Sequence, residues 1–120
     1  MNENPSWPIE LRVNPARDSL SISFDNGESY QLSAEYLRVE SPSAEVQGHT
    51  PQQRRYIGGK RQVKIARIET VGHYAARIIF DDGHDSGLYT WSYLCELGRE
   101  SERKWASYTR GLAAEGLSRD

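Results

Sequence analysis

The stretch that decides the fold is Ile78-Ile79-Phe80-Asp81-Asp82-Gly83 followed, after four intervening residues, by Leu88-Tyr89-Thr90-Trp91-Ser92-Tyr93-Leu94. Residues 22–27 (ISFDNG) and 32–37 (LSAEYL) repeat the same order of residue types. Each copy begins with an alternating apolar run, which predicts a strand that ends at a tight turn. A second short apolar run predicts the returning strand and the start of a helix. The chain is therefore expected to hold two hairpin–helix units.

The turns and helix starts of both units have recognisable residues. Asn-Gly and Asp-Gly pairs predict type I′ hairpin turns, in which both central residues have positive φ. Ser33 and Thr90 are predicted N-caps, whose hydroxyls accept hydrogen bonds from the first turn of a helix. The apolar side of each helix should pack on its hairpin. The expected anchors of a shared core are Tyr36, Leu37, Trp91 and Leu94.

The rest of the chain extends this α+β pattern. Alternation in residues 9–13 and 20–24 predicts an opening strand pair, and residues 63–67 predict a strand that leads through 71–73 into 74–80. Trp105, Tyr108 and Leu112 have helical spacing, so a helix is expected over residues 100–112, with residues 118–120 frayed. We therefore predict a small β-rich single domain with two pseudo-repeated hairpin–helix units plus a C-terminal helix.

Composition excludes several classes of protein. With 120 residues the chain is long enough for one core. Cys95 is the only cysteine, which excludes an intrachain disulfide framework and a thiolate-rich metal site. Its apolar neighbours predict a buried structural thiol. No apolar run reaches the roughly 18 residues of a membrane span, and residues 1–5 lack the basic start of a secretory signal, so the expected location is cytoplasmic.

Charge is distributed unevenly. The net charge is −2, yet no acidic residue lies between Val46 and Ile68. That segment holds six cations, which are Arg54, Arg55, Lys60, Arg61, Lys64 and Arg67. A local charge of this kind predicts a solvated basic face or a dock for an acidic protein partner. Nucleic acid is the weaker alternative through Arg54–Arg67, because the sequence pI is about 5.9 and dedicated nucleic-acid binders exceed about 9.

Two runs carry a family resemblance. Residues 37–49 read LRVESPSAEVQGH and residues 80–91 read FDDGHDSGLYTW. They resemble the gamma-butyrobetaine hydroxylase-like N-terminal domain family, whose bacterial stand-alone members form a domain of unknown function. The resemblance implies a small α+β domain at residues 8–98, preceded by a tail at 1–7 and followed by a helical extension at 99–120. In this family the domain also occurs joined to iron–sulfur carriers and to iron-dependent oxygenases, so the resemblance implies a role beside such proteins.

The same resemblance implies a zinc module that this chain does not retain. Three family cysteines fall on Ser41, Ser43 and Val46, and a family histidine falls on His84. Tetrahedral zinc needs sulfur or nitrogen donors, so only His84 remains a suitable ligand. We expect no cofactor and no structural zinc. The resemblance also implies that His84 lies close to Ser41 and Ser43.

The sequence leaves two interpretations of His84. With Asp82 and Asp85 it could form a metal or acid–base cluster, which would make the protein a metal-binding protein or a metal-dependent enzyme centred on His84. Alternatively, residues 82–85 form an exposed hairpin tip, where Asp and Gly are simply turn residues. The exposed tip is favoured, because perturbed sites need burial that a turn does not promise. No Gly-x-Ser-x-Gly elbow supports a serine nucleophile.

These observations favour a non-catalytic binding or accessory module. Its partner is expected to be another protein, and the resemblance points to an iron–sulfur or iron-dependent one; no membrane partner is expected. The candidate binding residues are Arg38, Ser41, Ser43, His49, Arg54, Arg55, Lys60, Arg61 and His84. Because this surface is expected to be exposed, joint charge reversal of Arg54, Arg55 and Lys60 should leave the melting temperature nearly unchanged.

Overall fold

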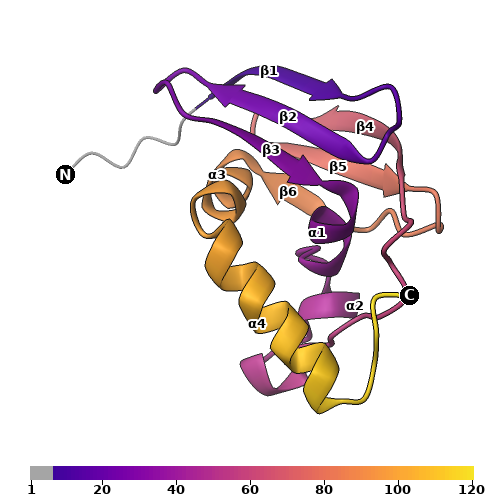
Figure 1. Ribbon diagram of the computed structural model, residues 1–120. Helices are drawn as coiled ribbons and strands as arrows, with labels where there is room; N and C mark the ends of the chain where they lie inside the picture. The colour runs from indigo at the N-terminus through magenta and orange to yellow at the C-terminus, as the bar shows by residue number, and fades with distance from the viewer. Residues whose placement is uncertain (1–6) are drawn as a thin grey trace.

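The computed structural model describes residues 7–120 and contains two three-stranded antiparallel meanders, each followed by a helix (Figure 1). The first unit comprises β1 (Pro8–Val13), β2 (Ser19–Phe24), β3 (Ser29–Ser33) and α1 (Ala34–Val39). The second comprises β4 (Ile65–Val71), β5 (Ala75–Phe80), β6 (Leu88–Thr90) and α3 (Trp91–Arg99). The α+β class and the two pseudo-repeated units are confirmed. Each unit contains three strands, one more than the two strands of its predicted hairpin.

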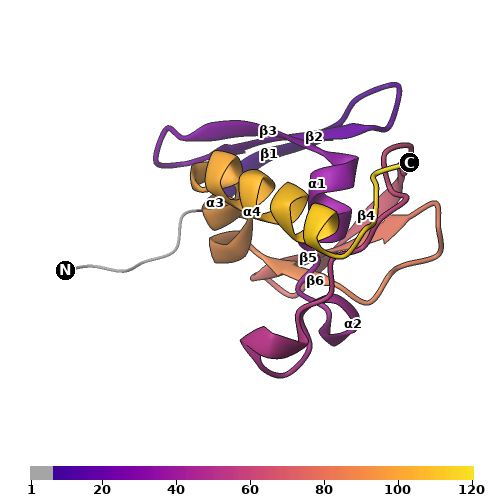
Figure 2. The same cartoon turned by 60° about the horizontal axis from the view of Figure 1, so that its bottom comes forward.

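Further helices lie in residues 40–64, hereafter the connection between the two units, and at the end of the chain. The connection contains α2 (Ala44–Gln47) and the short 3-10 helix η1 (Pro51–Gln53). After α3 the chain forms α4 (Ser101–Ala114), which confirms the C-terminal helix. Figure 2 shows α4 crossing beneath the first sheet, while α2 and η1 project away from the sheets. Among the described residues, no helix is long and apolar enough to cross a membrane.

The predicted N-caps are correct, but the predicted turn type is wrong. Ser33 Oγ accepts from the Tyr36 amide at 3.0 Å, and Thr90 Oγ1 accepts from the Tyr93 amide at 3.0 Å. Among the described non-glycine residues, only Arg17 has a positive φ, which excludes type I′ turns. Instead, Gly27 and Gly83 each have φ of 92°. Each donates to the phenylalanine three residues earlier, as in a type I turn with a glycine bulge.

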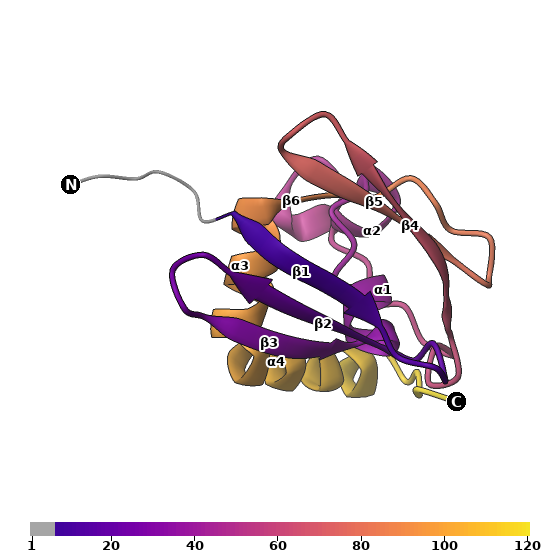
Figure 3. The same cartoon turned by 90° about the horizontal axis from the view of Figure 1, so that it is seen from above.

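The two units share one core. All four expected anchors are buried in a single apolar cluster that draws on β2, β3, β5, β6, α1 and α3. Cys95 is buried in the same cluster, and burial raises the pKa of its thiol, as expected of a structural cysteine. At one edge the Ile65 amide donates to Arg17 O at 2.8 Å, which joins the start of β4 to the β1–β2 turn. Figure 3 shows β1 and β4 diverging from this junction.

The C-terminal residues are docked, contrary to the expectation that they fray. The Gly59 amide donates to Ser118 O at 2.9 Å, and the Arg61 amide donates to Arg119 O at 3.0 Å. The Arg119 guanidinium donates to both carboxylate oxygens of buried Glu35, at 2.8 and 2.7 Å, and stacks over the Trp105 ring. These contacts hold the C-terminal tail, residues 118–120, between the connection and α1.

Candidate functional site

A buried polar cluster forms where the connection meets the second hairpin. Ser41 Oγ lies 2.9 Å from His84 Nε2, and His84 Nδ1 lies 3.1 Å from Glu45 Oε1. Ser43 Oγ lies 2.9 Å from Ser86 Oγ. The contact between His84 and Ser41 agrees with what the resemblance implies. It joins residues that are 43 positions apart in the sequence.

The exposed-tip interpretation is wrong for His84, which is 7% exposed. The bulged turn accounts for its burial. The Phe80 amide donates to His84 O at 3.0 Å, which turns the histidine back toward the sheet, and its ring lies 6.2 Å from the Phe80 ring. Asp85 does not join the cluster, because its carboxylate lies 3.7 Å from Arg77 Nη1 instead.

Asp82 anchors the neighbouring part of the cluster. Its Oδ2 accepts from Arg38 Nε at 2.8 Å and from Lys60 Nζ at 2.6 Å. Burial raises the pKa of Asp82, but hydrogen bonds from Lys60, the His84 amide and Arg38 outweigh it and lower the pKa to about 2. Arg38 and Lys60 are therefore occupied within the protein rather than offered to a partner.

Ser41, His84 and Glu45 have the distances of a hydrolytic triad but the wrong exposure. A triad places its serine at the surface and its acid inside. Here Ser41 is 0% exposed, whereas the Glu45 side chain is 71% exposed. A Cβ added at Gly87 would lie 2.5 Å from Ser41 Oγ, so the backbone closes over the hydroxyl. This arrangement supports a structural hydrogen-bond chain and leaves no room for a substrate.

The family zinc site does not fit these residues. Ser41 and Ser43 present hydroxyls engaged in hydrogen bonds, and the side chain of Val46 is apolar and 1% exposed. Both ring nitrogens of His84 already have partners. Across residues 7–120, no group of three or more His, Cys, Asp or Glu side chains could hold a metal ion. The cluster therefore has the wrong donors for the family metal.

We expect protein stability to be indifferent to a metal chelator. A structural zinc site supplies roughly 10–16 kcal/mol to a small domain, and a lone histidine cannot do so. Melting curves recorded with and without EDTA should therefore coincide, and elemental analysis of the purified protein should find far less than one zinc per chain. A stoichiometric metal whose removal unfolds the protein would contradict this prediction.

His84 should make stability depend on pH. Burial lowers the pKa of His84 below its ordinary 6.5, and the Arg38 charge adds to this effect against the opposing Glu45 and Asp82 carboxylates. The unfolded chain therefore binds more protons than the folded chain below pH 6.5. The stability contributed by neutral His84 is complete above pH 6.5 and is lost as the pH falls further.

Denaturant titrations between pH 6.5 and 4.5 test this, because that window lies above the ordinary value of 4.5 for glutamate. His84→Gln should flatten the decline in free energy of unfolding, whatever its effect on the absolute value. His73→Gln is the matched control, since His73 is exposed on the β4–β5 turn and should leave the slope unchanged. Equal slopes in wild type and His84→Gln would show that another group titrates.

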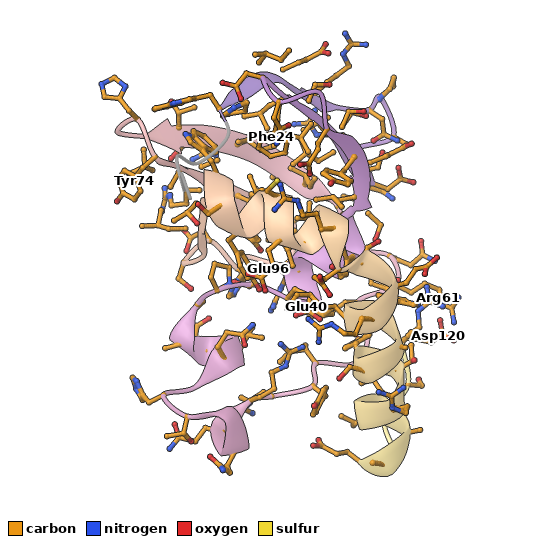
Figure 4. All side chains as sticks on the ribbon, turned by 90° about the vertical axis from the view of Figure 1, so that its left-hand side faces the viewer. Phe24, Glu40, Arg61, Tyr74, Glu96 and Asp120 are labelled. Carbon is orange, nitrogen blue, oxygen red and sulfur yellow. The ribbon has the colours of Figure 1, made fainter. Side chains whose placement is uncertain are left out.

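The basic segment is largely neutralised by carboxylates from elsewhere in the chain, which corrects the expected exposed basic face. Four of its six cations have a carboxylate partner, in the pairs Arg54–Glu40, Lys60–Asp82, Arg61–Asp120 and Arg67–Glu69. Figure 4 shows Arg61 beside Asp120. Among the described residues, only Arg55 and Lys64 of this segment lack such a pair. Most of the positive charge that nucleic-acid binding would require is therefore already paired within the protein.

A polar groove lies between the connection and α4. It has a volume of about 500 Å³. Its lining residues are Glu40, Gln47, Gly48, His49, Thr50, Arg54, Tyr56, Arg103, Lys104 and Ser107. Of the sequence-predicted site residues, the structure brings only His49 and Arg54 to this groove. Arg55 lies outside it, and the others lie in the buried cluster or in ion pairs of their own.

One wall of the groove is held by a buried ion pair. Arg54 Nη1 donates to Glu40 Oε1 at 3.1 Å, its Nη2 donates to Val39 O at 3.2 Å, and its guanidinium lies over the Tyr56 ring. Glu40 is 4% exposed, so the pair closes the inner end of the groove. On the other wall Lys104 Nζ lies 3.2 Å from Glu96. Figure 4 shows Glu40 and Glu96 near one another above the connection.

Sequence reasoning missed the α4 wall. Arg103, Lys104 and Ser107 have the i, i+1, i+4 spacing that places side chains on one helix face, next to the apolar face of Tyr108 and Leu112. This spacing can be read directly from the sequence. Glu40 and Glu45 carried no such signal, because their importance depends on partners that are distant in sequence or packed against them only in the fold.

Similar solved structures agree with the fold. One NMR solution structure is 44% identical, with 98% of this chain and 92% of that chain covered and a TM-score of 0.83. Another is 41% identical, with 99% and 88% covered and a TM-score of 0.83. A crystal structure of a protein of unknown function from Acidithiobacillus ferrooxidans, assigned to the DUF971 family, is 33% identical, with 76% and 91% covered and a TM-score of 0.64.

The search of curated proteins found no match. Residues 11–95 match the family described as "Gamma-butyrobetaine hydroxylase-like, N-terminal". This match covers both hairpin–helix units apart from their outermost residues, together with the connection between them. The chain therefore belongs to the gamma-butyrobetaine hydroxylase-like N-terminal family.

Proposed function

We propose that this protein is a non-catalytic binding module that acts as an accessory to another protein, and that the groove between the connection and α4 is its contact surface. The single observation that carries the proposal is the polar groove of about 500 Å³ with one wall fixed by the buried Arg54–Glu40 pair. Binding sites are typically preformed hollows of about 300–1,000 Å³ with a few oriented polar groups.

The lining favours an acidic side chain of the partner. The lining holds three cations, of which Arg54 pairs with Glu40 and Lys104 with Glu96, so Arg103 is the cation most able to reach an acidic group. His49 and Ser107 add polar groups around them. The Arg103 side chain is 66% exposed, so it can turn from its exposed partner Glu100 toward a bound carboxylate at little cost. A partner that inserts a glutamate or aspartate would meet this charge.

The resemblance supports a cytoplasmic partner that contains an iron–sulfur cluster or catalytic iron. It is the only support for that choice. The alternative of a metal-dependent enzyme at His84 is less favoured, because both ring nitrogens of that histidine are engaged and Ser41 is inaccessible. The ion pairs of the basic segment likewise count against nucleic acid.

The groove is tested with a photo-crosslinking residue at Ser107, on the groove wall. The same residue at exposed Ala113, further along α4 and outside the groove lining, is the matched control. In extracts of the source cells, Ser107 should crosslink a discrete protein that Ala113 does not. Mass spectrometry then identifies that protein, and elemental analysis measures its iron.

A charge variant sharpens the test. Arg103→Glu should reduce the crosslink at Ser107 by at least about tenfold, which corresponds to roughly 1.4 kcal/mol. Arg110→Glu, on the exposed face of the same helix, should not. Both changes are at exposed positions and should alter stability by under about 0.5 kcal/mol. Equal crosslinking at Ser107 and Ala113 would place the contact surface elsewhere.

A further inference from the structure

A hollow of about 420 Å³ lies between the start of α1 and the start of α4. The 3.6-residue period places its α4 residues, Glu102 and Trp105, on the opposite side of that helix from Arg103, Lys104 and Ser107 of the groove. The hollow is therefore separate from the groove. The side chains that matter for its chemistry are Leu32, Glu35, Tyr36, Glu102, Trp105 and Arg119.

One wall of the hollow holds a bound guanidinium, which belongs to the C-terminal tail. Arg119 Nε and Nη2 donate in parallel to the two carboxylate oxygens of Glu35, at 2.8 and 2.7 Å. The Arg119 Cζ lies 5.1 Å from the centre of the Trp105 ring. A planar guanidinium matches a carboxylate with two donors and stacks on an aromatic face, whereas an ammonium group lacks that fork. This wall is therefore arranged to recognise arginine.

The tail that carries Arg119 is held by few contacts. From Ala113 to Asp120, Arg119 is the only residue that is not exposed. The polar links of the tail to the connection are hydrogen bonds from the Gly59 and Arg61 amides and an ion pair between Arg61 and Asp120, whose side chains are 42% and 73% exposed. Figure 1 shows the chain reversing after α4 and returning toward α1. Segments with few buried contacts open locally at the lowest cost in free energy, so the tail can detach while the core stays folded.

Buried charge restricts what can replace the tail. When Arg119 leaves, the Glu35 carboxylate, whose side chain is 7% exposed, loses its counterion, and a buried charge without a counterion is strongly destabilising. Glu102, which has no ion-pair partner within residues 7–120, adds a second negative charge at the rim. The entering group must therefore be a cation. The two Glu35 oxygens beside the Trp105 ring select a guanidinium, and the volume of the hollow accommodates the segment that carries it.

We propose that this hollow is a binding site for an arginine side chain of another protein, and that Arg119 is an internal occupant which the partner's arginine replaces. The incoming guanidinium takes both oxygens of Glu35 and the face of Trp105. The released tail gives up its hydrogen bonds from Gly59 and Arg61. Because the tail is tethered, it competes at an effective concentration of about millimolar, which excludes weakly bound cations.

Arg119→Ala in the full chain tests whether the site accepts an arginine from outside. The variant should melt below wild type, and an acetylated and amidated glycine-arginine-glycine peptide should raise its melting temperature again. The lysine analogue of this peptide should need an at least about tenfold higher concentration, and the glutamine analogue should have no effect. Arg110→Ala, at an exposed residue of α4, is the matched control and should melt like wild type.

The wild-type chain tests the exchange itself, and this measurement remains informative if Arg119→Ala does not fold. Arginine peptide in excess over about millimolar should accelerate hydrogen exchange of the Gly59 and Arg61 amides at least about tenfold, because release of the tail removes their carbonyl acceptors. The Tyr93 amide, which donates to Thr90 in the second unit, is the internal control and should not respond. The glutamine peptide should leave all three amides unchanged.

Two results would overturn the proposal directly. One is a wild type whose Gly59 and Arg61 exchange ignores the arginine peptide, and the other is an equal response to all three peptides. Sedimentation of the wild type distinguishes a further occupant, the tail of a second copy. A wild type that stays at 13.7 kDa and takes up the arginine peptide supports a different protein as the partner. A dimer that Arg119→Ala abolishes would assign the hollow to a second copy and overturn the proposal.

Discussion

Arg54→Glu should destabilise the protein by about 3–5 kcal/mol, the cost of breaking a buried ion pair by removing one partner. The substitution leaves the Glu40 carboxylate, whose side chain is 5% exposed, without its cation and adds a second carboxylate beside it. It also removes the donor to Val39 O and the cation over the Tyr56 ring. Since small domains are stable by only about 5–15 kcal/mol, much of the population should unfold on mild heating.

The neighbouring arginine is the matched control. Arg55 is exposed and has no carboxylate partner among the described residues, so Arg55→Glu should change the free energy of unfolding by under about 0.5 kcal/mol. Urea titration of the two variants measures the contrast directly. The loss of stability expected for Arg54→Glu also replaces the expectation that joint charge reversal of Arg54, Arg55 and Lys60 leaves the melting temperature nearly unchanged. Equal effects of the two single variants would show that the Arg54–Glu40 pair is not structural.

Leu94→Ala should cost about 2–5 kcal/mol, the range for removing a buried leucine side chain from a packed core. Leu94 is 0% exposed and belongs to the apolar cluster shared by both units. Ser92→Ala, at an exposed position two residues away on the same helix, should stay within about 0.5 kcal/mol. Urea unfolding followed by circular dichroism and by tryptophan fluorescence measures both variants.

The two probes also test whether the core is truly shared. Because β2, β3, β5 and β6 pack into one cluster, damage in α3 should unfold both units together, and the two transitions should coincide. A Leu94→Ala protein with two separated transitions would mean that the units are stable independently of each other. A cost below about 0.5 kcal/mol would mean that the packed face of α3 has been misassigned.

Much of the fold could be predicted because its signals are local. The caps Ser33 and Thr90 lie beside the helices they begin, and the apolar alternation of each strand lies within the strand. The turn type could not be read as easily. Asp-Gly fits a type I′ turn, but one extra residue in the loop places only Gly83 at positive φ and makes Asp82 available to Arg38 and Lys60.

The candidate site was less predictable because its energetics depend on distant partners. The segment with Arg54 and Lys60 looked exposed, since a sequence shows the sign of a charge but not where its counterion will lie. Glu40 and Asp82 supply those counterions across 14 and 22 positions. His84 was misplaced for a related reason, because the bulge that turns it inward is a property of backbone geometry. Only the resemblance indicated that Ser41 lies beside it.

The docked tail has a consequence for how the chain folds during synthesis. Glu35 emerges from the ribosome 84 residues before Arg119, its bidentate partner. At roughly 5–20 residues per second, this interval lasts about 4–17 seconds. Throughout it the first sheet and α1 are present, yet burying the Glu35 carboxylate would leave a charge without a counterion. In the nascent first unit α1 is therefore expected to stay unpacked around Glu35. The native packing there is completed only when translation has passed residue 119.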